Sequence, residues 1–297
     1  MLPAARLALR CFLALIAMVS FARAAEPGRG LTNLFFAMDT GTKDVQHQTP
    51  ESQVAPVKRL GYDGIGIVGF AQLSEFLESC DRHGLRLFNI YVALNIDAGQ
   101  PFDSSLEQGL PKLQGHGAML WLSLISQKHQ PSAPDGDPEA MQLLGRVAQL
   151  AAKSGVKVAL YPHASFWLER TDDAVRLAQK ASRPEVGVTF NLCHFLRVEK
   201  EADLEAVLER AKPHLFVVSL NGAESGRRGA DWKELIQTLD RGSFDNLRLL
   251  KVLKQIRFTG PIGLQGYGIG GDVEDNLRRS MNAWRQLRTR SAAGEQP

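Results

Sequence analysis

Two imidazoles stand at the ends of apolar runs of strand length. His163 closes the run KVALYPH (157–163), and His194 follows Asn191 by three positions at the end of VGVTFNLCH (186–194). Imidazole titrates near neutral pH, so either ring can act as a base that removes a carbon-bound proton. A metal site of the D-x-x-H type requires Asp at position 191, where this chain has Asn. These residue types favour proton transfer over tight metal binding.

Polar side chains that can orient a ligand recur near the ends of other runs. Amides, phenols and hydroxyls supply hydrogen-bond donors and acceptors at fixed positions, as a polyhydroxyl ligand requires. Glu169 joins His163 and His194 as a catalytic candidate, with helix capping or Arg pairing as its open alternative. For each His the alternative is a hydrogen-bonded structural role. The candidate substrate-binding residues are Tyr161, Asn191, Ser219, Asn221, Gln265, Tyr267, Asn89, Tyr91 and Trp167.

Eight apolar runs alternate with helical segments and must position these side chains. Such alternation within one domain predicts an α/β fold, a (β/α)₈ TIM barrel over residues 25–290, followed by a polar tail at 291–297. An open doubly wound sheet is the alternative, but MDTGTKD (38–44) is a poor phosphate-binding turn. The runs span 34–39, 62–68, 85–95, 118–125, 157–163, 186–194, 214–222 and 261–268, and the clearest helices span 74–84, 138–155, 171–182 and 272–287.

Several of these runs alternate in polarity with a period of two, although buried parallel strands are normally apolar throughout. In the fifth run, Val158 and Leu160 alternate with Tyr161. The apolar series, which includes Phe88 and Phe216 in other runs, is predicted to face the helices. The second series then points into the barrel and becomes more polar towards the carboxyl ends of the strands, where barrel enzymes build their sites. The alternative is a polar core whose members satisfy one another.

Residues 1–24 are predicted to be a secretory signal peptide. Two arginines precede an apolar run that is too short to span a membrane, and Ala22-Arg23-Ala24 forms a small-x-small cleavage site. We therefore expect an exported protein, periplasmic or secreted, with no membrane contact after cleavage.

Removing the signal peptide changes the charge of the chain. It takes three of the 35 basic residues and no acidic ones, which leaves 32 basic against 32 acidic residues. A neutral mature chain predicts no nucleic-acid partner. Only Cys80 and Cys193 remain after cleavage, and the sequence leaves open whether they form a disulfide.

With these runs in place, the chain resembles the xylose isomerase-like barrel family, the broad sugar phosphate isomerase/epimerase group that also contains endonuclease IV. The resemblance covers about residues 31–288. It is most specific in GVKVALYPHASFWLERTDDAVRLAQK, PEVGVTFNLCHFL, PHLFVVSLNGAESG and GPIGLQGYGIGGD. It implies a small-molecule carbohydrate as partner, proton transfer next to a sugar carbonyl, and a divalent metal held at the barrel mouth by carboxylates and His.

The metal-binding positions that the resemblance implies are mostly changed in this chain. The family's carboxylates fall on Tyr161, Asn191 and Gln265, and a further His falls on Ser219, whereas His194 is kept. Amide oxygens are weak ligands for divalent ions, so the ligand set is degenerate. Carboxylates that would have to swing in to rebuild it are Glu169, Asp39 and Glu224.

The leading hypothesis is an exported sugar isomerase/epimerase-like enzyme that abstracts a proton next to a sugar carbonyl, giving isomerisation, epimerisation or elimination. The alternative is a non-catalytic carbohydrate-binding barrel with a degenerate metal site, which would bind a sugar without turnover. An endonuclease lacks support, because the metal ligands are missing and the mature chain is neutral. The sequence leaves open the identity of the sugar, its phosphorylation and the oligomeric state.

Overall fold

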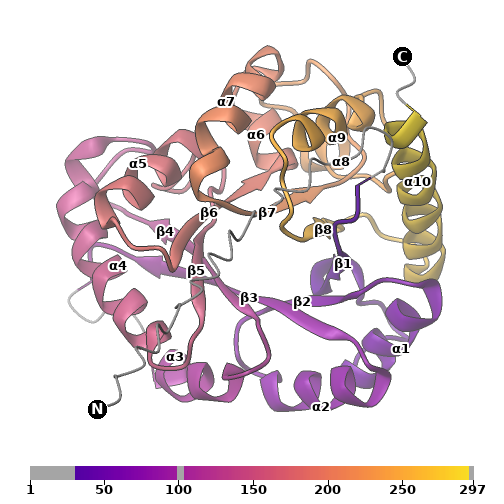
Figure 1. Cartoon of the computed structure of the whole chain (residues 1–297), viewed down its shortest axis with the longest axis horizontal. Helices are drawn as coiled ribbons and strands as arrows, with labels where there is room; N and C mark the ends of the chain where they lie inside the picture. Colours follow the sequence, from indigo (N-terminus) through magenta and orange to yellow (C-terminus); the bar gives the residue numbers. More distant parts are fainter. Residues whose placement is uncertain (1–30, 99–103, 294–297) are drawn as a thin grey trace, which may run out of the picture.

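Eight parallel strands close into a barrel in sequence order in this computed structural model, which describes residues 31–98 and 104–293. The helices surround the strands (Figure 1). This arrangement confirms the predicted single-domain (β/α)₈ barrel and rules out an open sheet. The predicted signal peptide, residues 1–24, lies outside the described residues.

The strands are β1 Phe35–Met38, β2 Gly64–Val68, β3 Arg86–Asn95, β4 Met119–Ile125, β5 Lys157–Leu160, β6 Val186–Asn191, β7 Leu215–Leu220 and β8 Ile262–Leu264. The α-helices are α1 Pro50–Leu60, α2 Leu73–His83, α3 Ser104–Gly109, α4 Asp137–Ala152, α5 Thr171–Ala181, α6 Leu192–Val198, α7 Leu204–Ala211, α8 Trp232–Leu235, α9 Asn246–Gln255 and α10 Val273–Ala293. Short 3₁₀ helices are η1 Asp39–Gly41, η2 Leu110–Leu113, η3 Pro134–Gly136, η4 Glu201–Asp203 and η5 Lys212–His214.

The predicted helices form where their sequence signals lie. Helix α2 buries Phe76 and Leu77 one turn before Cys80, and Gly84 ends it in the left-handed conformation with φ +59°. The Asp272 carboxylate accepts the Asp275 amide hydrogen bond at 2.7 Å and so caps the start of α10. The same helix runs through Ala293, three residues beyond the predicted end of the barrel domain.

The sequence runs overestimate two strands that carry site residues. β5 ends at Leu160 and β6 at Asn191, whereas the predicted strands continue to 163 and 194. Helix α6 begins directly at Leu192, so His194 lies on a helix rather than on a strand. From this position on the helix, the imidazole contacts the Tyr161 ring at the end of the barrel.

Two apolar layers hold the barrel together. The larger layer lies between strands and helices and includes Val158 and Leu160, as the polarity alternation predicts. The second, which we call the interior cluster, fills the barrel. Its buried members are Phe36, Met38, Phe88, Trp121, Ala159, Tyr161 and Val217.

Two phenylalanines that were predicted to face the helices lie inside the barrel, so that prediction is wrong. The β2–β3 register shifts between Ile65 and Gly66, and Phe88 on β3 stacks on Phe36 with ring centroids 4.5 Å apart. A second shift, between β6 and β7, lets Phe216 pack against the interior cluster. A β-bulge places two successive side chains on one face, which the strict alternation of a sequence pattern cannot anticipate.

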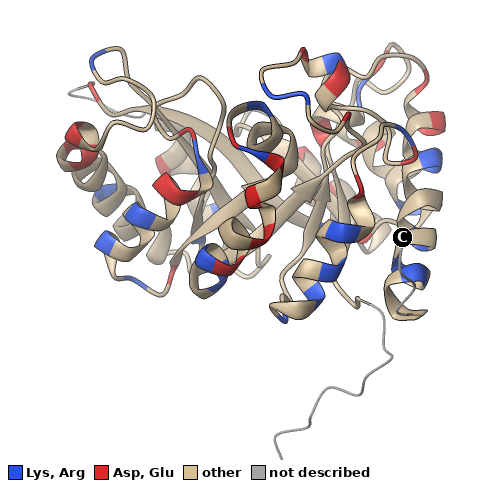
Figure 2. Cartoon of the chain, turned by 90° about the horizontal axis from the view of Figure 1, so that it is seen from above, with Lys and Arg blue, Asp and Glu red and all other residues tan. Residues whose placement is uncertain are grey.

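Basic and acidic residues are mixed over the helices and loops, and neither sign gathers in the view of Figure 2. No helix within residues 31–98 and 104–293 is long and apolar enough to cross a membrane. Cys80 and Cys193 are both buried free thiols, so the possible disulfide is not formed.

Candidate functional site

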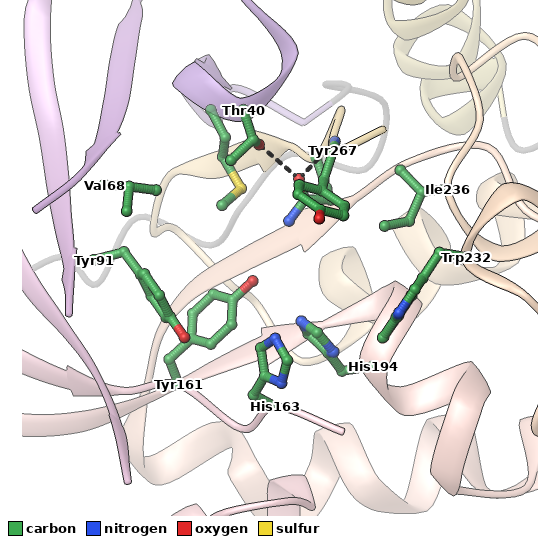
Figure 3. Close-up of a pocket in the computed structure, with 11 residues that line it drawn as sticks. Thr40, Val68, Tyr91, Tyr161, His163, His194, Trp232, Ile236 and Tyr267 are labelled. Atoms are coloured by element: carbon green, nitrogen blue, oxygen red, sulfur yellow. Dashed lines mark hydrogen bonds between the residues drawn. The ribbon is translucent and has the colours of Figure 1, made fainter. Parts of the chain in front are cut away.

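A cavity of about 360 Å³ opens at the carboxyl ends of the strands (Figure 3). Sites of barrel enzymes lie at this end, and the volume is at the lower end of the range typical of small-molecule sites. Six of the predicted site residues line this cavity: Tyr91, Tyr161, His163, His194, Gln265 and Tyr267. The other lining residues are Met38, Thr40, Val68, Trp232 and Ile236.

A continuous series of ring contacts connects the interior cluster to the two imidazoles. Trp121 packs on Tyr161 with centroids 5.2 Å apart, and Tyr161 meets His194 edge to face at 5.6 Å. The rings of His194 and His163 are 4.1 Å apart. Such contacts restrict the orientation of each ring, so the imidazoles are preorganised by the packing of the barrel itself.

The turn after β5 carries His163 and is tightly fixed. The backbone amide of Leu168 donates to the carbonyl of Leu124 at 3.0 Å, and that of His163 donates to the carbonyl of Leu168 at 2.9 Å. Ser165 has φ +70°, a left-handed conformation that is strained for a residue with a Cβ. The Glu169 carboxylate accepts the Ser165 amide hydrogen bond at 2.9 Å. Glu169 therefore holds this turn, and it does not line the cavity.

The backbone of Ala164 contacts both imidazoles and sets their tautomers. Its carbonyl lies 2.9 Å from His163 Nδ1, and a carbonyl can only accept, so His163 carries its proton on Nδ1. Its amide donates to His194 Nδ1 at 3.3 Å, so a neutral His194 carries its proton on Nε2. His163 then has an acceptor at Nε2, whereas His194 has a donor there.

Both Nε2 atoms are free to meet a ligand. Within the described residues neither has a protein partner, and neither is among the buried polar atoms that lack one. Because both rings line the cavity, these atoms reach its open space (Figure 3). The cavity thus receives one imidazole base and one imidazole hydrogen-bond donor.

The surroundings keep both imidazoles neutral. Burial lowers the pKa of His163 below its ordinary 6.5, against the opposing effect of the Ala164 carbonyl. Burial lowers the pKa of His194 much further, and the neighbouring His163 and Arg197 add to this effect. Neutral rings agree with the tautomers that Ala164 sets, because a doubly protonated ring could not accept the Ala164 amide.

Tyr161 supplies a protonated phenol beside the imidazoles. Burial raises the pKa of this phenol well above 10, and the neighbouring Cys193 and Tyr91 add to this effect, against a smaller opposing effect of Gln265. The phenol therefore keeps its hydrogen and can donate it to a ligand oxygen.

The residues at the family's metal-binding positions do not fit a divalent ion. Gln265 Oε1 accepts from Thr40 Oγ1, the Gly266 amide and the Tyr267 amide, at 2.9, 2.9 and 3.0 Å. Asn191 Oδ1 accepts from Ser219 Oγ at 2.7 Å, while its Nδ2 donates to the Pro162 carbonyl at 3.1 Å. These oxygens are occupied and uncharged, whereas a divalent ion in a partly dry site requires anionic oxygen ligands.

The carboxylates considered as substitutes are engaged elsewhere. Asp39 accepts from Lys43 and from the Val68 amide, both at 3.2 Å, and Glu224 accepts from Gln237 and Ser243. Within the described residues, no group of three or more His, Cys, Asp or Glu side chains could hold a metal ion.

Five predicted substrate-binding residues lie outside the cavity lining, and their contact with a substrate stays a prediction. Asn191 and Ser219 bond to each other, and Asn221 Nδ2 donates to the Leu235 carbonyl at 2.6 Å. Asn89 and Asn221 each keep a buried oxygen without a protein partner in the described part of the chain. Trp167 Nε1 donates to the Ala133 carbonyl at 2.9 Å.

The cavity contains five residues that the sequence argument missed. Trp232 and Ile236 come from the long segment after β7, which folds back on its own start through an antiparallel bridge between Gly222 and Gln237. Met38, Thr40 and Val68 end or follow β1 and β2, and proximity to a predicted strand end was the available signal. No periodic pattern marks the segment after β7.

A second cavity, of about 460 Å³, lies at the opposite end of the barrel. Residues at the starts of β4, β5 and β7 line it, and Lys157 is its one lining residue with an ionisable side chain. This second cavity is larger than the first but lacks the imidazoles and phenols that could act as acids or bases. The cavity at the carboxyl ends of the strands therefore remains the candidate site.

Solved structures of sugar-modifying barrels are similar to this chain. A 3-keto-D-glucoside 4-epimerase from E. coli is 18% identical with a TM-score of 0.66, covering 86% of this chain and 98% of its own. A D-psicose 3-epimerase with D-tagatose, from Clostridium cellulolyticum H10, is 14% identical with a TM-score of 0.65, covering 86% and 98%. An IOLI protein with a zinc atom is 14% identical with a TM-score of 0.67, covering 87% and 99%.

These similarities establish the fold, and the family follows from the sequence match. A comparison with curated proteins finds no match. The model of the xylose isomerase-like TIM barrel family matches residues 54–287, which is most of the 297-residue chain. This protein therefore belongs to the xylose isomerase-like TIM barrel family.

Proposed function

We propose that this protein is an exported enzyme that removes a proton from the carbon next to a sugar carbonyl without using a metal ion. The supporting observation is the opposite tautomers that Ala164 sets on His163 and His194. Proton abstraction beside a carbonyl requires a base at the carbon and a donor at the oxygen. One imidazole of this site suits each role, and similar barrels include sugar epimerases.

The proposed step balances within the site. His163 Nε2 takes the proton from carbon, and the electron pair of the C–H bond forms a carbon–carbon double bond. The carbonyl π pair moves to oxygen, where His194 Nε2–H and the Tyr161 phenol donate hydrogen bonds. An epimer forms if the enolate turns its other face to His163 before the proton returns. An isomer forms if the proton returns to the neighbouring carbon after the hydroxyl proton of that carbon has passed to the first oxygen. Loss of a group from the next carbon along gives elimination.

Deuterium exchange tests this proposal directly. The mature protein is dialysed against a chelator and incubated in D₂O with a panel of keto-sugars, and deuterium at the α-carbon is followed by mass spectrometry. We expect exchange without added metal. His163→Gln and His194→Gln should each slow it by roughly 10²- to 10⁴-fold, the usual contribution of a general acid or base. The control is His116→Gln, since His116 precedes β4 at the opposite end of the barrel.

Two results would contradict the proposal. Exchange that appears only when Mn²⁺ is added would mean that a metal polarises the carbonyl, and that the ligand set differs from the one described. Equal exchange rates in wild type and both His variants would remove the imidazoles from the chemistry.

A non-catalytic carbohydrate-binding barrel is the second candidate. It is favoured by one observation: the polar groups of Asn191 and Ser219 are used in internal bonds rather than at the cavity. This candidate predicts saturable sugar binding by the chelator-treated protein, with no deuterium exchange in any member of the panel.

Export is part of the proposal and rests on the signal-peptide features of residues 1–24. Cleavage after Ala24 would leave Ala25 as the first residue. Amino-terminal sequencing of protein recovered from the periplasm or the medium tests this, and recovery of full-length chain in the cytoplasm alone would contradict it.

A further inference from the structure

The cavity combines a polar floor with an apolar rim. Tyr161, His194 and Gln265 are buried, with exposed fractions of 2%, 5% and 5%, and they form the floor. At the opening, Val68 is 50% exposed and Tyr267 is 59% exposed. We call these two residues the apolar rim. Within the described residues the third strongly exposed large hydrophobic side chain is Val45, which does not line the cavity.

The rim residues come from different strand ends. Val68 ends β2 and Tyr267 follows β8, and Figure 3 shows them at separate places around the same opening. A ligand that fills the cavity and extends through its opening would cover both exposed apolar side chains. A free monosaccharide carries hydroxyl groups over most of its surface, so it can fill the floor but leaves the rim in water.

The lining carries no formal charge. None of the eleven described residues that line the cavity is Lys, Arg, Asp or Glu. Lys43 pairs with Asp39 at 3.2 Å, and the Arg197 guanidinium lies 4.5 Å from the ring centre of Trp232 and donates to the Ala230 carbonyl. A phosphate group in a protein site normally pairs with Arg or Lys or with a group of backbone amides. Among the described residues, no unengaged cation lines this cavity.

We infer that the substrate is an uncharged glycoside whose sugar ring carries a keto group, with this ring in the polar floor and an apolar aglycone at Val68 and Tyr267. This inference rests on the proposed function and specifies its substrate class. The sugar hydroxyls meet the phenol, imidazole and amide groups of the floor. The aglycone covers the exposed side chains of Val68 and Tyr267 and so shields them from water. The sugar ring alone does not reach them.

Matched pairs of glycosides test the inference. Methyl and phenyl glycosides of glucose, galactose, mannose and xylose, which lack the keto group and therefore bind without reacting, are titrated calorimetrically, beside glucose 6-phosphate. In the pairs that bind, the phenyl glycoside should bind roughly three- to tenfold more tightly, which is about what one aromatic contact provides. Glucose 6-phosphate should show no binding.

Variants locate the effect. Tyr267→Ala and Val68→Ser should each lower the ratio of the methyl glycoside Kd to the phenyl glycoside Kd towards one. Val45→Ser is the matched control at an exposed site outside the cavity, and it should leave this ratio unchanged. Equal Kd values for methyl and phenyl glycosides, or tight binding of glucose 6-phosphate, would overturn the inference and leave the sugar site standing. Binding of none of the pairs would overturn the inference, and deuterium exchange with the keto-sugars would then decide separately whether the proposed function stands.

Discussion

His163 and His194 lie with their ring centroids 4.1 Å apart and bond to opposite ends of one residue, Ala164. Each ring uses Nδ1 for this contact, but one donates and the other accepts. Two adjacent imidazoles of the same tautomer would offer a ligand two bases or two donors. The shared backbone instead offers one of each, which is what enolisation of a carbonyl compound requires.

Nuclear magnetic resonance should show these tautomers directly. In protein with ¹⁵N-labelled histidine at about pH 7.5, above the ordinary imidazole pKa, His163 should have its proton on Nδ1 and His194 on Nε2. The reason is that the Ala164 carbonyl can only accept and its amide can only donate. Assignment uses the His163→Gln and His194→Gln variants. The same tautomer on both rings would show that Ala164 does not fix them.

The two histidines should also make stability depend on pH. Their pKa values lie below 6.5 in the folded protein, so as the pH falls below 6.5 the unfolded chain binds protons that the folded protein does not. The contribution of the two histidines to the free energy of unfolding should therefore decrease from about pH 7.5 to about pH 5.5. The stabilisation that the two neutral histidines contribute is fully present above pH 6.5. It is lost as the pH falls towards the pKa values of the histidines in the folded protein.

Urea denaturation of wild type and of a His163→Gln/His194→Gln double variant measures this contribution. Glu199 acts in the opposite direction, because burial raises its pKa to about 7 and its proton stabilises the fold as the pH falls. Both proteins keep Glu199, so its effect cancels in the difference between them. A difference that stays constant over that pH range would contradict the lowered pKa values.

The barrel could be predicted from the sequence because strand-length runs and helical segments repeat in order along the chain. Alternation of polarity predicted correctly that Tyr161 lies inside the barrel. The same prediction failed at Phe88 and Phe216, where a bulge interrupts the alternation. The two histidines were found because they stand at strand ends. The tautomers were not predictable, since they depend on which atoms of Ala164 meet each ring.

Several polar residues that were predicted to bind a substrate instead form hydrogen bonds within the protein. Asn191 and Asn221 are polar and lie at strand ends, as ligand-binding residues would, yet their amides tie neighbouring segments together. Sequence patterns identify a buried polar group but not its partner. Residues of the segment after β7, such as Trp232, have no periodicity to reveal them. Tertiary contacts such as the backbone pairing of Gly222 with Gln237 and the stacking of Arg197 on Trp232 hold them at the cavity.

Restoring two carboxylates should create a metal site. In the variant Asn191→Asp/Gln265→Glu, one oxygen of the carboxylate introduced at position 265 can keep the three donors of Gln265, and its second oxygen adds a charge where the amide nitrogen was. We expect tighter Mn²⁺ binding than in wild type, measured calorimetrically. The carboxylate introduced at position 191 cannot donate to the Pro162 carbonyl as the Asn191 amide does, so the variant should be less stable by about 1–3 kcal/mol. Unchanged Mn²⁺ affinity in a folded variant would contradict the alignment of these strand ends with the family's metal ligands.

Close packing between β2 and β3 should make Gly64 intolerant of a side chain. A Cβ at Gly64 would lie 1.9 Å from the Arg86 carbonyl oxygen and 2.8 Å from the Phe88 ring, and neither can move without disturbing the bulge. Gly64→Ala should therefore reduce the free energy of unfolding by at least about 1–3 kcal/mol. Gly145→Ala is the matched control, because Gly145 lies within α4 and a Cβ there meets nothing within 4 Å. That substitution should raise stability by about 0.5–1 kcal/mol through helix propensity. Urea denaturation followed by circular dichroism measures both, and a Gly64→Ala variant as stable as wild type would contradict the described strand register.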